Sequence, residues 1–507
     1  MANFYITTAI DYANGDPHMG HAFEKIGADV IARYRRLRGD NVRFAIGMDE
    51  HGQKVLKEAE LQGLPPQEWV DGIADQFATI WGRLNVSNTD FVRTTDQSHM
   101  EAVQDLVRRV QAAGDIYLDR YEGYYCDRCE AFRKESELVD GECAEHPGHD
   151  IGWTEEENYF FRLSDYTQPL LDHIAAHPEF IQPVSRRNEI LRLLEGGLED
   201  ISASRARVPW GVPFPDADGH TVYVWFDALP NYLSALGFPA EGYADWWPAA
   251  LHVIGKDITR FHCVIWPAML MSAGLPLPAT VWAHGFVMIS GGKLSKSEAK
   301  LLDLETLVDR RGPDAFRFIM MREVSWDADR DFPSVASFLQ QFDTRYQADL
   351  ANDLGNLLNR TVSMVDKYRD GVIPAGDSTE LDTAAEAALG EYVDHMDALQ
   401  LQDGLEDVMS IVHRSNGWID SQAPWALSRD PDKSDALDAV LGALIRALAR
   451  TAVALSPFMP EKSAEIWSRL GGAGTLPVFD ELADHWPTRL PEKPEGVLFP
   501  RIEAPGE

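Results

Sequence analysis

The sequence predicts an α/β protein in which a Rossmann-like parallel-sheet domain carries an insertion and is followed by an all-α helix-bundle domain. Three observations favour this class. Residues 4–49 read as strand, helix and strand, residues 117–220 interrupt the α/β pattern, and apolar residues recur at helical spacing from about residue 337 onward. With 507 residues the chain is too long for one core and should divide into about three domains.

The amino-terminal residues carry clear local signals for the first three elements. Residues 4–10 are β-branched and aromatic, and a loop rich in turn residues follows them. Asp16 and Pro17 have the character of an N-cap and a first helical position, and apolar residues then recur on one helix face. A second strand, residues 42–49, ends in a carboxylate. These lengths predict a right-handed parallel crossover, with ligands beyond the carboxyl ends of the strands.

A His-Met-Gly-His sequence lies in the first turn expected for that helix. Unpaired backbone N–H groups and the helix dipole favour a phosphate there. His18 and His21 could donate hydrogen bonds to a reacting phosphate, and Gly20, which lacks a Cβ, could let a base or ribose lie against the backbone. Taken alone, such a pair is more often capping or structural. The chain has neither the Gly-rich dinucleotide fingerprint nor a Walker-type loop, so a nucleotide would be bound in another way.

Residues 288–300 place a glycine hinge before clustered lysines, an arrangement that suits a mobile phosphate-binding loop. The chain uses arginine more often than lysine, yet Lys293, Lys296 and Lys300 lie close together. A compact ammonium on a flexible stem can follow a phosphate as its geometry changes. A lone Lys-x-x-Lys is more often a solvated loop, so the functional interpretation depends on a partner motif elsewhere in the chain.

Two short pairs of potential metal ligands lie within residues 117–220. Pairs of this kind, separated by a loop, fit tetrahedral zinc. Four ligands leave no open coordination position, so we expect one structural Zn²⁺ per chain. The alternative is a set of three buried cysteines, and His149 is a less favoured fourth ligand. The predicted ligands are Cys126, Cys129, Cys143 and His146.

The charge balance limits the classes of partner. A formal net charge of −35 gives a generally negative surface that repels phosphate backbones, so any nucleic-acid site must be a local patch. The first apolar residues lack a basic leader, and no apolar run reaches the length of a bilayer. We therefore expect a cytoplasmic protein with no membrane partner.

Taken together, the two phosphate-binding candidates resemble the signatures of class I aminoacyl-tRNA synthetases. Residues 18–21 are similar to the HIGH signature and residues 293–297 to the KMSKS signature, each departing at its second, apolar position. Several further stretches resemble the methionyl-tRNA synthetase family. They are Asp49-Glu-His-Gly52, Val224-Trp-Phe-Asp-Ala228, Gly255-Lys-Asp257 and Ala423-Pro-Trp425.

This resemblance implies ATP-dependent ligation of L-methionine to methionine tRNA, both initiator and elongator, through a methionyl adenylate, with release of AMP and pyrophosphate and with Mg²⁺ accompanying ATP. It assigns catalysis to His18, His21, Lys293 and Lys296, with Gly20 and Ser295 also contacting ATP. It places Asp49 on the methionine ammonium group. The other methionine-site residues it implies are Ala9, Ile10, Tyr12, Trp225, Ala228, Tyr232, Asp257, Phe261, His262 and Trp266.

The last third of the chain predicts helices over residues 381–400, 402–420 and 435–456. The resemblance implies that four residues there read the anticodon by edge hydrogen bonds and stacking. They are Asn356 and Arg360, four apart on one helix face, with Pro424 and Trp425. Without the resemblance, the last two would be interpreted as a helix-boundary turn with a packing tryptophan.

These observations divide the chain into five segments. Residues 1–116 and 221–285 form the two halves of the catalytic Rossmann-like domain, 117–220 the connective insertion with its zinc knuckle, 286–336 the lysine loop and stem-contact segment, and 337–507 the anticodon-binding domain and tail. We expect a monomer, because no dimerisation module is visible beyond the bundle.

Two alternatives stay open. One is another class I synthetase, for example for cysteine, whose pocket would place a metal at the amino acid. The aromatic slot and the Ala-Pro-Trp sequence argue against it. The other is a non-catalytic tRNA-binding paralogue, against which the retention of both histidines and both motif lysines argues.

Overall fold

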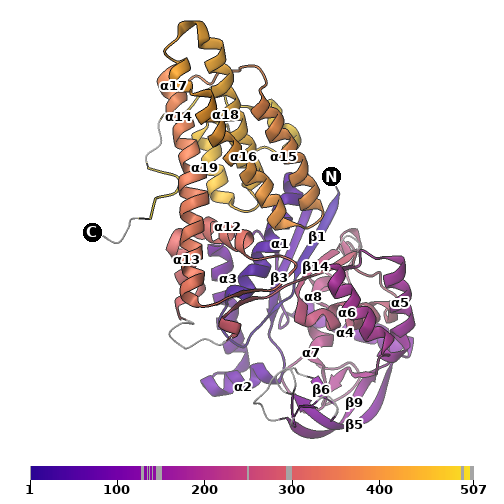
Figure 1. The fold of residues 1–507 in the computed structure, drawn as a ribbon. Helices are drawn as coiled ribbons and strands as arrows, with labels where there is room; N and C mark the ends of the chain where they lie inside the picture. The colour runs from indigo at the N-terminus through magenta and orange to yellow at the C-terminus, as the bar shows by residue number, and fades with distance from the viewer. Residues whose placement is uncertain are drawn as a thin grey trace.

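The computed structural model describes residues 2–126, 131–133, 135, 138–139, 141–143, 151–247, 250–292, 300–492 and 496–502. Figure 1 shows three parts: a parallel sheet with helices at the centre, a β-rich part at one end and a bundle of helices at the other. The predicted fold class is therefore confirmed.

The central sheet has seven strands, and every pairing recorded within it is parallel. Its order is β10-β15-β14-β1-β3-β2, and β4 also pairs with β3. The chain order reverses between β1 and β14, so the crevice at their carboxyl ends is the expected place for ligands. The strands are β1 (Asn3–Thr8), β2 (Asp11–Tyr12), β3 (Asn41–Asp49), β4 (Asp90–Arg93), β10 (Ile181–Gln182), β14 (Ala250–Gly255) and β15 (Thr280–His284).

Helix α1 (Met19–Leu37) packs its apolar face on this sheet, as its periodicity predicts. The expected start at Asp16 and Pro17 is wrong, because His18 is the N-cap. Its Nδ1 accepts a hydrogen bond from the backbone N–H of Gly20 at 3.2 Å, and Nδ1 of His21 accepts one from the N–H of His18 at 3.2 Å. Two imidazoles therefore provide the capping that the carboxylate of Asp16 was expected to provide.

Three further helices follow β3 and β4: α2 (Gln53–Gln62), α3 (Pro66–Arg83) and α4 (Gln97–Ala113). The β-rich part comes next, as an antiparallel sheet in the order β11-β9-β5-β6. Its strands are β5 (Ile116–Cys126), β6 (Ala131–Arg133), β9 (Gly152–Phe161) and β11 (Ile201–Ser202), accompanied by the pairs β7 (Leu138–Val139) with β8 (Glu142–Cys143) and β12 (Ser204–Arg205) with β13 (Thr221–Val222).

One strand from this stretch of chain joins the central sheet. Between α5 (Thr167–Ala176) and α6 (Val184–Glu195), the two residues of β10 pair in parallel with Val281 and Trp282 of β15. The inserted segment thus contributes an edge strand to the parallel sheet.

Several short elements complete the α/β part of the chain. They are α7 (Val224–Ala228), α8 (Asn231–Ser234), a π-helical turn (Phe261–Ile265) leading into α9 (Trp266–Ser272), the parallel pair β16 (Val287–Ile289) and β17 (Arg330–Phe332), α11 (Leu304–Arg311) and α12 (Pro313–Glu323).

The carboxyl-terminal part of the chain is a bundle of helices. They are α13 (Val335–Arg345), which continues through a π-helical stretch (Tyr346–Leu354) into α14 (Gly355–Arg369), then α15 (Glu380–Asp397), α16 (Leu401–Gln422), α17 (Pro424–Leu427), α18 (Ser434–Leu455) and α19 (Pro460–Arg469). Of these, α15, α16 and α18 lie close to the three spans that periodicity predicts. The tail packs back on the bundle, because Leu498 and Phe499 are buried and the hydroxyl of Tyr346 donates to the carbonyl of Pro500 at 3.0 Å.

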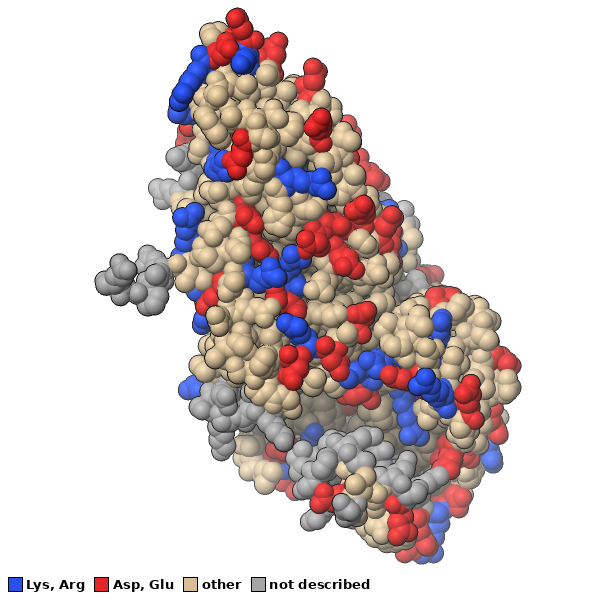
Figure 2. All heavy atoms as spheres, in the orientation of Figure 1, with Lys and Arg blue, Asp and Glu red and all other residues tan. Residues whose placement is uncertain are grey.

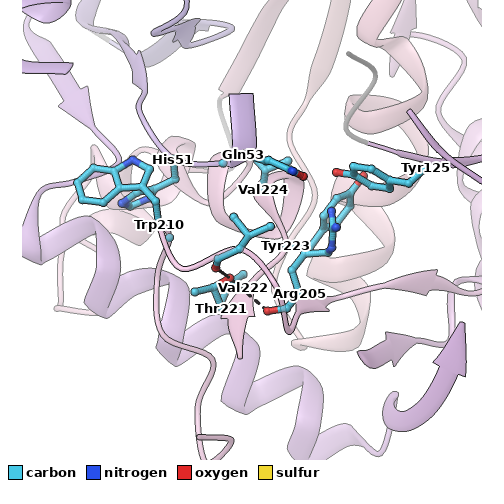
Figure 3. Close-up of a pocket in the computed structure, with 12 residues that line it drawn as sticks. His51, Gln53, Tyr125, Arg205, Trp210, Thr221, Val222, Tyr223 and Val224 are labelled. Atoms are coloured by element: carbon cyan, nitrogen blue, oxygen red, sulfur yellow. Dashed lines mark hydrogen bonds between the residues drawn. The ribbon is translucent and has the colours of Figure 1, made fainter. Parts of the chain in front are cut away.

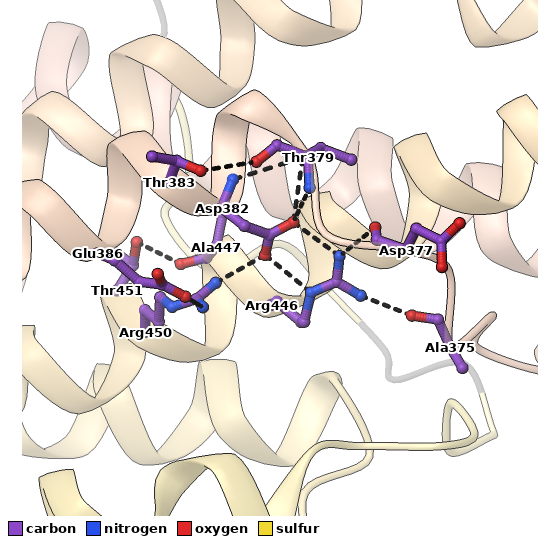
Figure 4. Close-up of polar contacts among 10 residues, drawn as sticks. All are labelled: Ala375, Asp377, Thr379, Asp382, Thr383, Glu386, Arg446, Ala447, Arg450 and Thr451. Carbon is purple, nitrogen blue, oxygen red and sulfur yellow. Dashed lines mark hydrogen bonds and ion pairs between the residues drawn. The ribbon is translucent and has the colours of Figure 1, made fainter.

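A buried carboxylate fastens α15 to α18 (Figure 4). Asp382 accepts from Arg446 Nη2 at 2.7 Å and from Arg450 Nη1 at 2.9 Å, and it caps α15 together with Thr379. Burial opposes ionisation of Asp382, but the two guanidinium groups and the cap hold its pKa well below its usual range. The ion pairs therefore fix the position of α15 relative to α18.

The surface agrees with the acidic composition. Figure 2 shows acidic side chains spread over the helical and β-rich parts, with basic side chains interspersed. Within the part of the chain that the structure describes, no helix is long and apolar enough to cross a membrane.

Candidate active site

The two histidines of α1 lie together at the carboxyl end of β1. Their rings stack with centroids 3.7 Å apart and an interplanar angle of 22°. Nδ1 of each ring accepts a backbone N–H, so the neutral ring carries its proton on Nε2 and can donate from there. Desolvation, His18 and Lys25 together lower the pKa of His21 well below its usual value. The helix terminus therefore presents neutral hydrogen-bond donors to an anion.

The residues from the first half of the sheet that are predicted to bind methionine lie at the same edge. Ala9 follows β1, and its backbone N–H donates to the carbonyl of Val253 on β14 at 3.1 Å. Tyr12 lies opposite Asp49 in the pairing of β2 with β3. The carboxylate of Asp49 thus ends a buried strand beside the aromatic ring of Tyr12.

The aromatic residues from the second half of the sheet form a connected group. Trp225 of α7 and Phe261 stack with ring centroids 3.6 Å apart. The hydroxyl of Tyr232 lies 2.6 Å from Nε2 of His262, whose Nδ1 donates to the carbonyl of Ile258 at 3.0 Å. This tautomer makes Tyr232 the donor. Burial lowers the pKa of His262 to about 4, so its ring adds no charge to an apolar site.

A supporting histidine was missed by the sequence reasoning. His252 of β14 stacks on Tyr232 with centroids 4.1 Å apart, and its Nε2 accepts from the indole of Trp266 at 3.3 Å. Its Nδ1 lies 2.8 Å from the hydroxyl of Thr7. The only signal in the sequence is a histidine within an otherwise apolar strand. It orients two of the predicted aromatic side chains, because all of its polar atoms are matched.

A pocket adjoins this aromatic group, between the central sheet and the β-rich part (Figure 3). His51 and Trp210 lie on one side and Tyr125 and Arg205 on the other, with Val224 between them, directly before Trp225. Sequence reasoning assigned none of these residues a role. The Asp-Glu-His-Gly and Val-Trp-Phe-Asp-Ala stretches contain His51 and Val224 and could have indicated these two.

Two polar residues that line the pocket, His51 and Arg205, are bonded to carboxylates outside its lining. Asp227 lies 2.6 Å from Nδ1 of His51 and 3.0 Å from Nε2 of His99. Burial opposes ionisation of Asp227, but the two imidazoles hold its pKa below its usual value. Arg205 makes two hydrogen bonds of 3.1 Å to Glu156 and lies over the ring of Tyr125, so both cationic and aromatic groups in the pocket are fixed in place.

The predicted lysine loop is described only at its flanks, because Lys293, Ser295 and Lys296 lie outside the described residues. Strand β16 leads into it, and Ser290 and Gly291 adopt positive φ angles of 54° and 61°. The N–H of Gly291 donates to Asp331 at 3.3 Å and the hydroxyl of Ser290 to the carbonyl of Pro333 at 3.2 Å. The residues that precede the loop are therefore sharply turned and anchored by hydrogen bonds.

The predicted residue Asp257 follows β14 at the same edge. Its carboxylate lies so close to Gly255 that a Cβ at that glycine would be 2.6 Å from Oδ1. The glycine of the Gly-Lys-Asp stretch thus makes room for the carboxylate. Ala228 is the last residue of α7, the helix that also carries Trp225, and it is buried.

Two of the four predicted zinc ligands are described. Cys126 ends β5, Cys143 ends β8, and both are buried. Cys129 and His146 lie outside the described residues. Among the residues that are described, no group of three or more potential ligands occurs. Buried cysteine side chains at strand ends are compatible with the expected zinc knuckle.

The predicted anticodon residues lie on two helices of the bundle. Asn356 and Arg360 lie on α14, and Arg360 pairs with Asp420 of α16 at 2.8 Å. Pro424 begins α17 after Ala423, which has a positive φ of 44°. Trp425 is 42% exposed, so it does not serve mainly to pack the turn. Its ring is available at the surface.

Comparisons with known proteins agree with this arrangement. Residues 4–151 and 147–362 match the family described as tRNA synthetases class I (M), and residues 370–492 match the anticodon binding domain of methionyl tRNA ligase. The chain is 42% identical to the methionine–tRNA ligase of Caldanaerobacter subterraneus subsp. tengcongensis, over 99% of this chain and 80% of the relative. It is 40% identical to that of Bacillus subtilis, over 99% and 78%.

Solved structures give the same answer. The chain is similar to Mycobacterium tuberculosis methionyl-tRNA synthetase in complex with methionyl-adenylate, with a TM-score of 0.93 and 41% identity over 99% of this chain and 100% of the other. Against the apo form of that enzyme the TM-score is 0.87, with 38% identity over 100% and 99%. This chain belongs to the methionyl-tRNA synthetase family of class I aminoacyl-tRNA synthetases.

Proposed function

We propose that this chain joins L-methionine to methionine tRNA in an ATP-dependent reaction that passes through methionyl adenylate and releases AMP and pyrophosphate. Its relatives are methionine–tRNA ligases, and one similar structure holds methionyl-adenylate. The observation that carries the proposal is the meeting of two neutral histidines at a helix N-terminus with an aromatic group at the same sheet edge.

In the first step, the methionine carboxylate attacks the α-phosphate of ATP in line and pyrophosphate leaves. His18 and His21 donate from Nε2 to the phosphate oxygens, whose charge increases in the transition state, and the N–H groups at the start of α1 add to this. Gly20 leaves room for the nucleotide against the backbone. Mg²⁺ bound with ATP would neutralise phosphate charge.

The lysine loop adds cationic groups to the same site. Lys293 and Lys296, with the hydroxyl of Ser295, would contact the phosphates, as the resemblance to the KMSKS signature implies. Because flexible ammonium groups can follow the phosphates as the bond breaks, their contribution is larger in the transition state than in the ground state.

Methionine is selected by an apolar, aromatic slot. Asp49 and Asp257 hold polar groups of the substrate, and the side chain lies among the aromatic rings because sulfur contacts ring edges well and forms few hydrogen bonds. The neutral state of His262 keeps the slot free of positive charge. The slot consists of Ala9, Ile10, Tyr12, Trp225, Ala228, Tyr232, Phe261, His262 and Trp266.

The tRNA is recognised on the helical domain. Trp425 offers an exposed ring for stacking, while Asn356 and Arg360 offer hydrogen bonds to base edges, so initiator and elongator tRNA with the same anticodon are both substrates. This local site is compatible with a net charge of −35, because it needs only a few well-placed groups. We also propose that the protein acts in the cytoplasm as a monomer, for which sedimentation equilibrium should return 56.7 kDa.

We propose that one structural zinc is held by Cys126, Cys129, Cys143 and His146. Metal analysis of purified protein should give one zinc per chain, and Cys143→Ser should lose it. Full zinc retention by Cys143→Ser would exclude this ligand set. Two zinc ions per chain would show that further ligands are involved.

Methionine-dependent ATP–pyrophosphate exchange, run against a panel of other amino acids, tests the proposed reaction without tRNA. We expect exchange with methionine, and none with cysteine. Folded, zinc-replete protein that supports no exchange with any amino acid would instead be a tRNA-binding paralogue.

A further inference from the structure

A lysine lies fully buried in the second turn of α1, beneath the proposed active site. The side chain of Lys25 has no exposed surface. Its ammonium group donates to the carbonyl of Ala9 at 2.9 Å, to Oδ1 of Asp11 at 2.8 Å and to Oε1 of Glu24 at 2.9 Å. All three donors of the ammonium group are therefore used.

The partners of Lys25 belong to different parts of the site. Ala9 lies in the connection between β1 and β2, Asp11 begins β2, and Glu24 is on α1 itself. Glu24 extends the network further, because its Oε2 lies 3.2 Å from Nε2 of His284 at the carboxyl end of β15. The network thus joins two strands and a helix at the sheet edge where the substrates meet.

Each substrate has residues that depend on this network. On the methionine side, residues 9–12 carry Ala9, Ile10 and Tyr12, and the pairing of β2 with β3 aligns Tyr12 with Asp49. On the ATP side, His21 is one helical turn before Lys25, so the two lie on the same face of α1. Lys25 therefore links α1, whose terminus binds phosphate, to the methionine-binding segment through hydrogen bonds to Ala9 and Asp11.

We propose that Lys25 is a positioning residue that sets the distance between the methionine carboxylate and the α-phosphate of ATP, by tying residues 9–11 to α1. This inference rests on the methionine site proposed above and goes beyond it, because Lys25 touches neither substrate. In-line attack needs the reacting atoms within about 3–3.5 Å of each other, and a misplacement of about 1 Å can lower the rate about 100-fold.

A purely stabilising role makes a different prediction. Taking two carboxylates and an ammonium out of water is costly, and well-packed apolar residues often replace buried ion pairs without loss of stability. An ion pair kept only for stability could be replaced with no effect on substrate constants once the variant is folded. A positioning role predicts a kinetic defect at a temperature where the variant remains folded.

The test is pyrophosphate exchange by Lys25→Met, with Lys462→Met as the matched control. Lys462 loses the same charge on α19, where it pairs with Glu465 far from the sheet edge. In Lys25→Met we expect kcat to fall about 100-fold and KM for methionine to rise. Residues 9–12, which form one wall of the methionine site, lose their hydrogen bonds to Lys25 in this variant. KM for ATP should change less than about twofold, since the hydrogen bonds of His18 and His21 remain. Lys462→Met should match the wild type.

Asp11→Asn serves as a second variant. It removes the carboxylate charge at Asp11 and leaves the other two acceptors of Lys25, Ala9 and Glu24, in place. It should raise KM for methionine several-fold in folded protein, and it carries the test if Lys25→Met does not fold. Unchanged kcat and KM in either folded variant would overturn the positioning role, as would equal defects in Lys462→Met. Loss of methionine-dependent exchange in the wild type would instead contradict the proposed function itself.

Discussion

The α/β part and the helical part of the molecule use polar side chains in opposite ways. At the sheet edge, His252 and His262 are buried, and the donors and acceptors of both rings are matched within the protein. On the helical bundle, the candidate recognition residue Trp425 is exposed, and the buried carboxylate of Asp382 caps α15 and fastens it to α18.

This difference follows from what each region has to do. A reaction at phosphorus needs groups fixed in advance in a site of low polarity, because reorganisation during the reaction would lower the rate. Reading single-stranded bases needs exposed rings and hydrogen-bonding groups on a rigid support. The two regions should therefore fail in different ways when they are mutated.

The largest expected effect belongs to the α/β part. His21→Ala should lower kcat of pyrophosphate exchange about 100- to 1,000-fold, the usual effect of removing one donor to transition-state charge. KM for methionine should change little, because the aromatic slot is untouched. An equal loss in methionine affinity, measured by calorimetric titration, would show that His21 supports ground-state binding and would weaken the contrast between the regions.

The next largest effect is on stability in the bundle. Asp382→Asn should lower the free energy of unfolding by about 3 kcal/mol, because it leaves Arg446 and Arg450 facing a neutral group. Since the folded pKa of Asp382 is depressed, its contribution is present above the unfolded value of about 3.9 and is lost as the pH falls below it. Chemical unfolding at pH 7 and at acid pH checks both parts. An identical difference at the two pH values would contradict the ion-pair explanation.

A smaller effect is expected from the exposed tryptophan. Trp425→Ala should lower kcat/KM for tRNA in aminoacylation about 5- to 150-fold, as stacking contributes about 1–3 kcal/mol per base. Trp418→Ala is not a suitable control because that ring is packed on the core, whereas Leu61→Ala removes another exposed apolar side chain, on α2. A matching loss in Leu61→Ala would mean that the effect is not specific to the bundle.

The smallest effect concerns pH. Because the pKa of His21 lies well below its usual value, the ring is neutral and keeps its Nε2 proton as the pH rises from 6 to 8. The ratio of wild-type to His21→Ala exchange rates should therefore stay constant over this range. A ratio that falls as the pH rises through about 6.5 would mean that the protonated imidazolium is the active form.

Local patterns predicted much of this structure. The spacing of apolar residues predicted a helix over 402–420, and α16 runs over Leu401–Gln422, because helical periodicity depends only on neighbouring residues. The start of α1 was predicted wrongly. An Asp-Pro pair is a common start for a helix, but here the imidazoles of His18 and His21 accept the backbone N–H groups of the first turn.

The features that escaped prediction depend on contacts distant in sequence. His252 and Thr7 are neighbours only because β14 pairs with β1, and the two residues of β10 are too few to show a periodicity. Likewise, Lys25 interrupts an apolar helix face, and nothing in the local sequence relates it to the carbonyl of Ala9. Site residues could be named from motifs, whereas the side chains that hold them could not.

The most direct test of the contrast between the two regions is to measure pyrophosphate exchange and aminoacylation side by side in His21→Ala and Trp425→Ala. We predict that His21→Ala lowers both activities about 100- to 1,000-fold, because adenylate forms too slowly, and that Trp425→Ala lowers aminoacylation about 5- to 150-fold while exchange stays at the wild-type rate. Loss of exchange in Trp425→Ala, in protein with wild-type thermal stability, would show that the helical part contributes to adenylate formation and would contradict the division of roles.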